Sequence, residues 1–252
     1  MRILSQVKNT LIYECESDQE LIKTIGDQMI ALINSHDHCL IAMSPWNTPV
    51  PLFRYLTDNY NRNKTCYKHI SFYMIDEIAC DDKNSKLNFR SFMYKNFFDE
   101  INVKCKNIHS PIDYSEDHEY SRYDRAIWQA NSIDLLVISI GEKGELNFVN
   151  HETNLNSLTH VVKINDDKTR CKFNTEFNYP HDALPEYIVT MGIRTILNAN
   201  RIIAIARGKR KAEAIKKIMS GEVDDNYACT QLLNHRDVSI YIDEAAGSLL
   251  DK

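Results

Sequence analysis

The chain has 252 residues, of which 43% are hydrophobic and 26% are charged, a composition typical of a soluble globular protein. Its net charge of −5 supplies no general positive field, so we expect no nucleic acid partner. Its apolar runs fall short of the roughly 20 residues that cross a bilayer, and residues 1–8 lack the apolar core of a signal peptide. We therefore expect a cytoplasmic protein with no membrane partner.

Cysteine and histidine usage gives no sign of a disulfide framework or a metal centre. The seven cysteines are odd in number and contain no C-x-x-C pair, which predicts reduced thiols, several of them buried. Of the nine histidines, only His36 and His38 lie close together. We interpret them as part of a polar turn before a strand, with a metal site as the weaker alternative. We expect no metal and no cofactor.

Helix-like and strand-like segments alternate along the chain. Ser17 and Glu20 have capping-box spacing and precede apolar residues that repeat at helical intervals as far as Ile33. In chain order, the predicted elements after this first helix are strand 39–43, helix 50–61, strand 69–75, helix 89–98, helix 114–131, strand 134–140, helix 185–199, strand 202–206, helix 208–220 and strand 238–242.

Continuous apolar strands that alternate with helices predict an α/β fold. We expect residues 1–252 to form a single three-layer domain, in which a mainly parallel central sheet is covered by helices on both faces. Ligands of open α/β sheets bind outside the carboxyl ends of the strands. The loops that would lie there are 44–49, 76–86, 141–150 and 207–211.

Three segments carry a resemblance to a known family. Asp76-Glu77 ends a predicted strand, residues 88–99 read NFRSFMYKNFFD, and residues 190–199 read TMGIRTILNA. They are similar to the strand-end Asp-Glu, to S-Y-x-S-F-M-x-x-N-F-F and to T-x-G-[IV]-x-T-[IL]-L-x-A of the glucosamine-6-phosphate deaminase and galactosamine-6-phosphate isomerase family. A more distant similarity is to 6-phosphogluconolactonase. The resemblance covers roughly residues 10–245, implies a small phosphorylated sugar as partner, and leaves a homo-oligomer open.

One loop of this family reads G-x-G-x-D-G-H-x-x-F-N-E, and this chain departs from it at the chemical positions. Gly141 and Gly144 match the frame, but the Asp, His and Glu of the pattern are replaced by Lys143, Glu145 and Asn150. A glutamate has an unperturbed pKa of about 4.3, whereas an imidazole has one of about 6.5. We also expect the Lys143 ammonium to pair with the carboxylate of Glu142, Glu145 or Asp76.

The loop after the first predicted parallel strand is altered as well. The family's T-G-G-T-P becomes Pro45-Trp46-Asn47-Thr48-Pro49, so two glycines become bulky residues while Thr48 keeps its hydroxyl. Trp46 either fills the phosphate pocket of the family or offers a platform on which a ligand ring stacks.

The loop that opens the last predicted helix keeps more of the family's pattern. Gly208 and Lys211 match its glycine and its phosphate-contacting lysine. A helix start with a nearby lysine is suited to an anion, so the resemblance implies that Thr48, Gly208 and Lys211, beside Trp46, contact the substrate and its phosphate.

The resemblance implies that Asp76 is the base that moves a proton between C2 and C1 of the sugar, with Glu77 as its acidic neighbour in the catalytic group. The alternative for this pair is a structural role, because carboxylates often cap turns.

The sequence leaves two candidate functions for the protein. One is an aminosugar-phosphate isomerase or deaminase with a rearranged set of acids and bases. The other is a pseudoenzyme that serves as a sugar-phosphate sensor, a regulator or a protein-interaction module.

Overall fold

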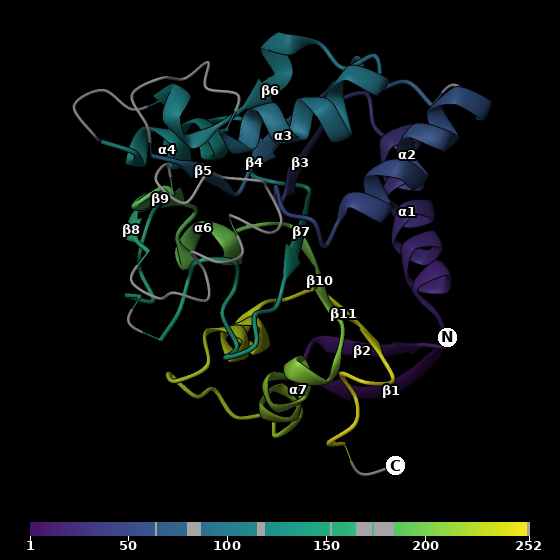
Figure 1. Ribbon diagram of the computed structural model, residues 1–252, viewed down its shortest axis with the longest axis vertical. Helices are drawn as coiled ribbons and strands as arrows, with labels where there is room; N and C mark the ends of the chain where they lie inside the picture. Colours follow the sequence, from purple (N-terminus) through teal and green to yellow (C-terminus); the bar gives the residue numbers. More distant parts are fainter. Residues whose placement is uncertain are drawn as a thin grey trace.

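A sheet of eight mostly parallel strands runs through the centre of the computed structural model (Figure 1). The structure describes residues 1–63, 65–79, 87–114, 119–151, 153–164, 173 and 184–250. In order across the sheet, the strands are β1 (Arg2–Val7), β2 (Thr10–Cys15), β11 (Val238–Asp243), β10 (Arg201–Ala206), β7 (Leu135–Ser139), β3 (Cys39–Met43), β4 (Ile70–Met74) and β6 (Ile108–His109). β1 is antiparallel to β2, and the other neighbours are parallel.

Helices cover both faces of this sheet, which confirms the predicted three-layer α/β fold. The first face packs against α1 (Asp18–Ser35), α2 (Val50–Asn63) and α3 (Phe89–Asn96). The second face packs against α4 (Ser121–Gln129), α6 (Ile193–Leu197) and α7 (Ala212–Met219). Each face of the sheet has its own apolar core, because successive side chains of a strand point to opposite faces of the sheet.

A second, three-stranded antiparallel sheet was not predicted from the sequence. Its strands, in order, are β5 (Asp76–Ile78), β9 (Tyr187–Thr190) and β8 (His160–Lys163). The predicted helix over 185–199 is therefore wrong in its first half, since only α6 is helical there. Residues 187–190 read YIVT, and such β-branched and aromatic side chains suit a pleated strand as well as a buried helix. Pairing with β5 and β8 decides between the two.

Most of the other predicted elements agree with the structure to within a few residues. The predicted strand 39–43 has the bounds of β3. The predicted strands 134–140, 202–206 and 238–242 differ from β7, β10 and β11 by a single residue, at both ends for β7 and at one end for β10 and β11. The predicted helix 114–131 is shorter than expected, because α4 covers only Ser121–Gln129 and residues 111–114 form a 3-10 turn. Residues 115–118, and 80–86 of a predicted ligand loop, lie outside the described residues.

The carboxyl ends of four adjacent strands bring the predicted ligand loops to one edge. The strands β10, β7, β3 and β4 are consecutive in the sheet. With about 4.8 Å between neighbours, the outer two lie about 15 Å apart. Asp76, Gly141 and Gly208 follow β4, β7 and β10 and so emerge at this edge.

The cap that begins α1 can be tested by mutation. The Ser17 Oγ accepts a hydrogen bond from the Glu20 N–H at 3.1 Å, as the sequence predicts. We expect Ser17→Ala to lower the free energy of unfolding by about 1 kcal/mol, measured by urea denaturation, because this amide loses its acceptor. Ser17→Asp keeps an acceptor and should stay within a few tenths of a kcal/mol of the parent. Equal losses in both variants would contradict the capping role.

Candidate active site

Asp76 lies at the first position of β5 and is completely buried. Its Oδ1 accepts a hydrogen bond from the Thr190 hydroxyl at 2.6 Å, and its Oδ2 accepts one from the Asn147 amide at 2.6 Å. The Trp46 side chain donates a further hydrogen bond to this carboxylate. Burial raises the pKa of Asp76 to about 7, although the three hydrogen bonds favour the charged form and oppose the shift.

Asn147 and Ser44 are site residues that the sequence analysis missed. Asn147 has a positive φ of 53°, a left-handed conformation that asparagine tolerates better than most residues. Its Oδ1 accepts a hydrogen bond from the Ser44 hydroxyl at 2.7 Å while its Nδ2 donates to Asp76. Ser44, Asn147 and Asp76 therefore form a continuous chain of hydrogen bonds across the ends of three strands. The sequence places both residues in the expected ligand loops 44–49 and 141–150, but no motif marks their side chains there.

Glu77 points to a different part of the molecule and has a structural partner. Its carboxylate accepts hydrogen bonds from the N–H groups of Phe89 (2.7 Å) and Arg90 (3.0 Å), which are the first residues of α3. It also accepts from the Ile78 N–H and the Ser110 hydroxyl. Burial raises the pKa of Glu77 to about 7 against the effect of these backbone donors. A catalytic role for Glu77 stays a prediction, and the geometry favours the capping alternative.

Trp46 belongs to an aromatic cluster beside Asp76. Its ring lies 5.4 Å from Phe89, 5.3 Å from Phe148 and 5.5 Å from Phe173, centroid to centroid, and all three pairs are tilted. Such tilted contacts at this distance are favourable for aromatic pairs. With its ring packed against phenylalanines and its side chain hydrogen-bonded to Asp76, Trp46 fits the space-filling alternative better than an open stacking platform.

The turn after β7 satisfies its own polar groups. The Glu145 carboxylate folds back and accepts a hydrogen bond from the Lys143 N–H at 2.9 Å. It approaches Gly141 so closely that a Cβ there would lie 2.0 Å from its Oε2, so a larger residue at 141 would displace the Glu145 side chain from this position. The Asn150 N–H donates to the Thr153 hydroxyl at 3.2 Å in the next turn.

The predicted ion pair of Lys143 is wrong. Glu142 pairs instead with Arg210, Nη1 to Oε1 at 3.1 Å. In the part of the chain that the structure describes, no carboxylate lies within ion-pair distance of the exposed Lys143 ammonium. The positive charge is free to extend into water because the turn places Lys143 at its exposed tip.

The predicted phosphate loop is partly occupied by the chain's own groups. Gly208 has a φ of 87°, and its N–H donates to both oxygens of the Asp243 carboxylate, at 3.0 and 2.9 Å. Arg207 reaches the Thr48 carbonyl at 3.4 Å and pairs with Asp18 at 2.9 Å. These contacts bring the Thr48 and Gly208 loops together, as predicted. Lys211 is half-buried one turn later.

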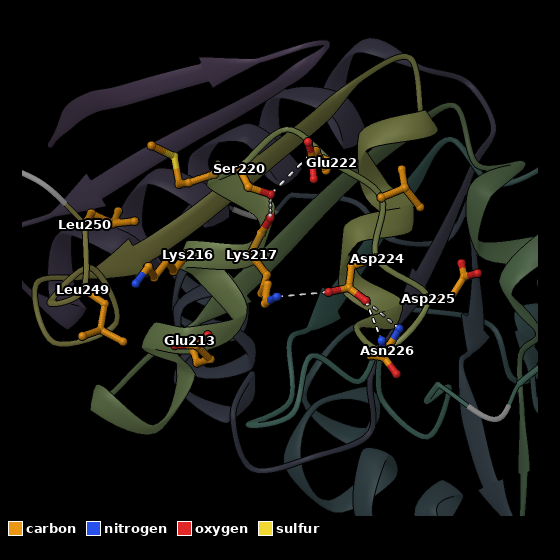
Figure 2. Close-up of a pocket in the computed structure, with 12 residues that line it drawn as sticks. Glu213, Lys216, Lys217, Ser220, Glu222, Asp224, Asp225, Asn226, Leu249 and Leu250 are labelled. Carbon is orange, nitrogen blue, oxygen red and sulfur yellow. Dashed lines mark hydrogen bonds and ion pairs between the residues drawn. The ribbon is translucent and has the colours of Figure 1, made fainter.

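A shallow groove lies elsewhere, between α7, the loop that follows it and the last described residues (Figure 2). Lys217 pairs with Asp224 across it at 3.1 Å, and Leu249 and Leu250 form one side. None of the predicted site residues lines this groove, so it is separate from the Asp76 site.

A metal centre or membrane helix has no support in the described ranges. They contain no group of three or more histidine, cysteine, aspartate or glutamate side chains placed to hold a metal ion. Nor do they contain a helix with the length and apolar character needed to span a bilayer.

Comparison with known sequences decides the family. Residues 15–241 match the sequence model of glucosamine-6-phosphate isomerases/6-phosphogluconolactonase. The chain belongs to this family. The resemblance seen in the strand-end and helix motifs is thereby confirmed, and it extends over almost the whole chain.

Individual relatives agree with this assignment. The chain is 31% identical to the glucosamine-6-phosphate deaminase of Clostridium novyi over 237 residues, 93% of this chain and 96% of the relative. It is 29% identical to that of Thermoanaerobacter sp. over 92% of both chains. Among solved structures, a monomeric glucosamine-6-phosphate deaminase superimposes with a TM-score of 0.87 at 27% identity, covering 94% of this chain and 99% of that one. A 6-phosphogluconolactonase from Thermotoga maritima, 18% identical over 93% of this chain and 99% of its own, shares the fold with a TM-score of 0.72.

The capping role of Glu77 predicts a large effect on stability. Glu77→Ala leaves the first amides of α3 and the Ser110 hydroxyl without their buried acceptor. We expect a loss of at least about 2 kcal/mol in the free energy of unfolding, measured by urea denaturation. Glu100→Ala, at an exposed carboxylate just after α3, is the matched control and should change it by less than about 0.5 kcal/mol. A Glu77 variant as stable as this control would rule out the cap.

Proposed function

We propose that this chain serves aminosugar metabolism as a non-catalytic sugar-phosphate-binding protein that has lost the deaminase reaction of its relatives. Membership of the family supports the metabolic setting, and the relatives named above are glucosamine-6-phosphate deaminases. The proposal combines that ancestry with a site whose chemical groups are rearranged.

The state of Asp76 is the observation that carries the proposal. A general base must come within hydrogen-bond reach of the proton that it removes. Here both carboxylate oxygens are buried and accept hydrogen bonds from Thr190, Asn147 and Trp46. A sugar carbon could reach this carboxylate only after at least one of these donors had moved away.

The other replacements act in the same direction. Positions that carry Asp, His and Glu in the family pattern hold Lys143, Glu145 and Asn150, and the Glu145 carboxylate is engaged within its own turn. A lost acid or base typically costs about 10²–10⁴-fold in rate. Three such losses would remove any useful deaminase activity.

A rewired enzyme is the second candidate, and one observation favours it. Burial raises the pKa of Asp76 to about 7, close to the pH at which a general base works best. If Trp46 and Asn147 moved aside for a ligand, this carboxylate could still exchange a proton. The two candidates differ in whether turnover is measurable.

We expect no ammonia release from glucosamine 6-phosphate, measured with a coupled glutamate dehydrogenase assay at enzyme concentrations far above those needed for an active relative. The Clostridium novyi deaminase, assayed in parallel, is the positive control. Turnover that is lost in Asp76→Asn would contradict the proposal and establish the rewired enzyme.

We also expect weak binding of phosphosugars, with a Kd of order 0.1–1 mM, because about two charge-assisted hydrogen bonds must offset the cost of ordering the ligand. Isothermal titration calorimetry with glucosamine 6-phosphate measures this directly. Lys211→Ala should weaken the binding, whereas Lys209→Ala, an exposed lysine of the same basic stretch, should leave it unchanged. Equal effects of the two variants would place the anion elsewhere. The absence of any binding would point to a module recognised by protein partners alone.

A further inference from the structure

The buried Asp76 carboxylate connects three segments that are distant in sequence. Thr190 reaches it from β9, Asn147 from the turn after β7, and Trp46 from the loop after β3. The indole N–H is a donor only, whereas the threonine hydroxyl and the asparagine amide can each donate or accept. The three contacts therefore respond differently when the carboxylate gains a proton.

We propose that Asp76 is a proton-controlled latch for Trp46, which holds the indole in the aromatic cluster when ionised and loosens it when protonated. The proposal extends the proposed function, since it describes how access to the same site is regulated. It concerns only contacts within the chain and does not require that a sugar phosphate binds.

The neighbours of Asp76 are arranged to accept its proton without a clash. If Oδ2 becomes a hydroxyl, the Asn147 amide can flip so that its oxygen accepts and its NH₂ group donates to the Ser44 hydroxyl instead. Ser44 loses its donor role and becomes an acceptor, so the chain of hydrogen bonds reverses direction and stays complete. Trp46 has no such option.

The consequence for Trp46 is a weaker anchor. Hydrogen bonds to an ionised acceptor are roughly twice as strong as those between neutral groups. After protonation, the indole N–H can donate only to a neutral carboxylic acid, so its hydrogen bond weakens. The packing against Phe89, Phe148 and Phe173 then contributes a larger share of what holds the ring in place. Trp46 is partly exposed, so its loop can open toward the strand ends at lower pH.

The surroundings place this change near neutral pH. Burial raises the pKa of Asp76 to about 7, and the negative charge of Glu77, the next residue on β5, raises it further. The segments after β3 and β7 present the neutral Trp46 and Asn147, and β9 presents the neutral Thr190. On β8, His160 pairs in register with Thr190, so it is the titratable neighbour on the same face of the small sheet.

Tryptophan fluorescence tests the latch directly. The chain has two tryptophans, and Trp128→Phe leaves Trp46 as the sole reporter. Among the described residues, the Trp128 Nε1 has no hydrogen-bond partner, so phenylalanine there breaks no hydrogen bond seen in this part of the chain. We expect the emission of Trp46 to change in one step between pH 5 and 9, with a midpoint of about 7 and stronger acrylamide quenching on the acid side.

Variants identify the group that titrates. Asp76→Asn should abolish the step, whereas His160→Gln should keep it and Glu77→Gln should keep it with a lower midpoint. Thr190→Val removes a hydrogen bond that favours the charged form, so it should move the midpoint to higher pH. This last variant gives a result even if Asp76→Asn does not fold. Circular dichroism over the same range confirms that the fold is intact.

Two results would overturn the latch. One is a pH-independent Trp46 signal in the single-tryptophan protein. The other is a step that persists in Asp76→Asn or disappears in His160→Gln or Glu77→Gln, because the titrating group would then be elsewhere. Neither result bears on ammonia release or sugar binding, so failure of the latch and failure of the proposed function are distinguishable.

Discussion

The arrangement of this site depends on one constraint, which is that a buried carboxylate must have its oxygens satisfied. Asp76 sits where β4 has ended and β5 leaves the main sheet for the small one. The hydrogen bonds that its oxygens accept come from the protein itself, with Thr190, Asn147 and Trp46 as the donors. Their positions in turn determine the conformation of the loops after β3 and β7. An isolated ionised carboxylate at this depth would be far more costly.

The neighbouring acids Asp76 and Glu77 divide their roles because successive residues of a strand point to opposite sides. Asp76 faces the strand ends and connects the loops there. Glu77 faces α3 and accepts hydrogen bonds from its first two amides, in addition to the Asn88 side chain that caps the helix, with the Ser110 hydroxyl as a further donor. The fold of this chain therefore uses the Glu77 carboxylate whether or not Asp76 takes part in a reaction. The presence of an Asp-Glu pair in a sequence is weaker support for activity than the family pattern suggests.

Much of the fold could be predicted from the sequence, because buried parallel strands are continuous apolar runs and helix starts carry recognisable caps. Strand 39–43 and the Ser17 cap are examples. The small sheet could not be predicted in this way, because Tyr187–Thr190 forms a strand only through its pairing with β5 and β8. In the site, the resemblance led to Asp76 and Trp46, whereas Ser44 and Asn147 lie in the expected ligand loops at positions that no motif specifies. Their role arises from distance in space, which spacing along the chain does not reveal.

Gly141 and Gly144 in the loop after β7 match the family's glycine pattern for reasons of packing, and this match is separate evidence from the presence of catalytic side chains. Gly141 leaves room for the Glu145 carboxylate, and a Cβ there would overlap it. Gly144 has a φ of 77° and lies against Tyr227 and Cys229, where a Cβ would come within 3 Å of both side chains. The turn that this chain forms therefore favours glycine at 144 through its positive φ, and glycine at 141 lets the Glu145 carboxylate fold back in the place of the family's histidine. A matching glycine frame is therefore explained by the packing of the turn and does not by itself establish which chemistry the turn supports. Within the turn, the Glu145 carboxylate accepts from the Lys143 N–H, and the Asn150 N–H finds the Thr153 hydroxyl.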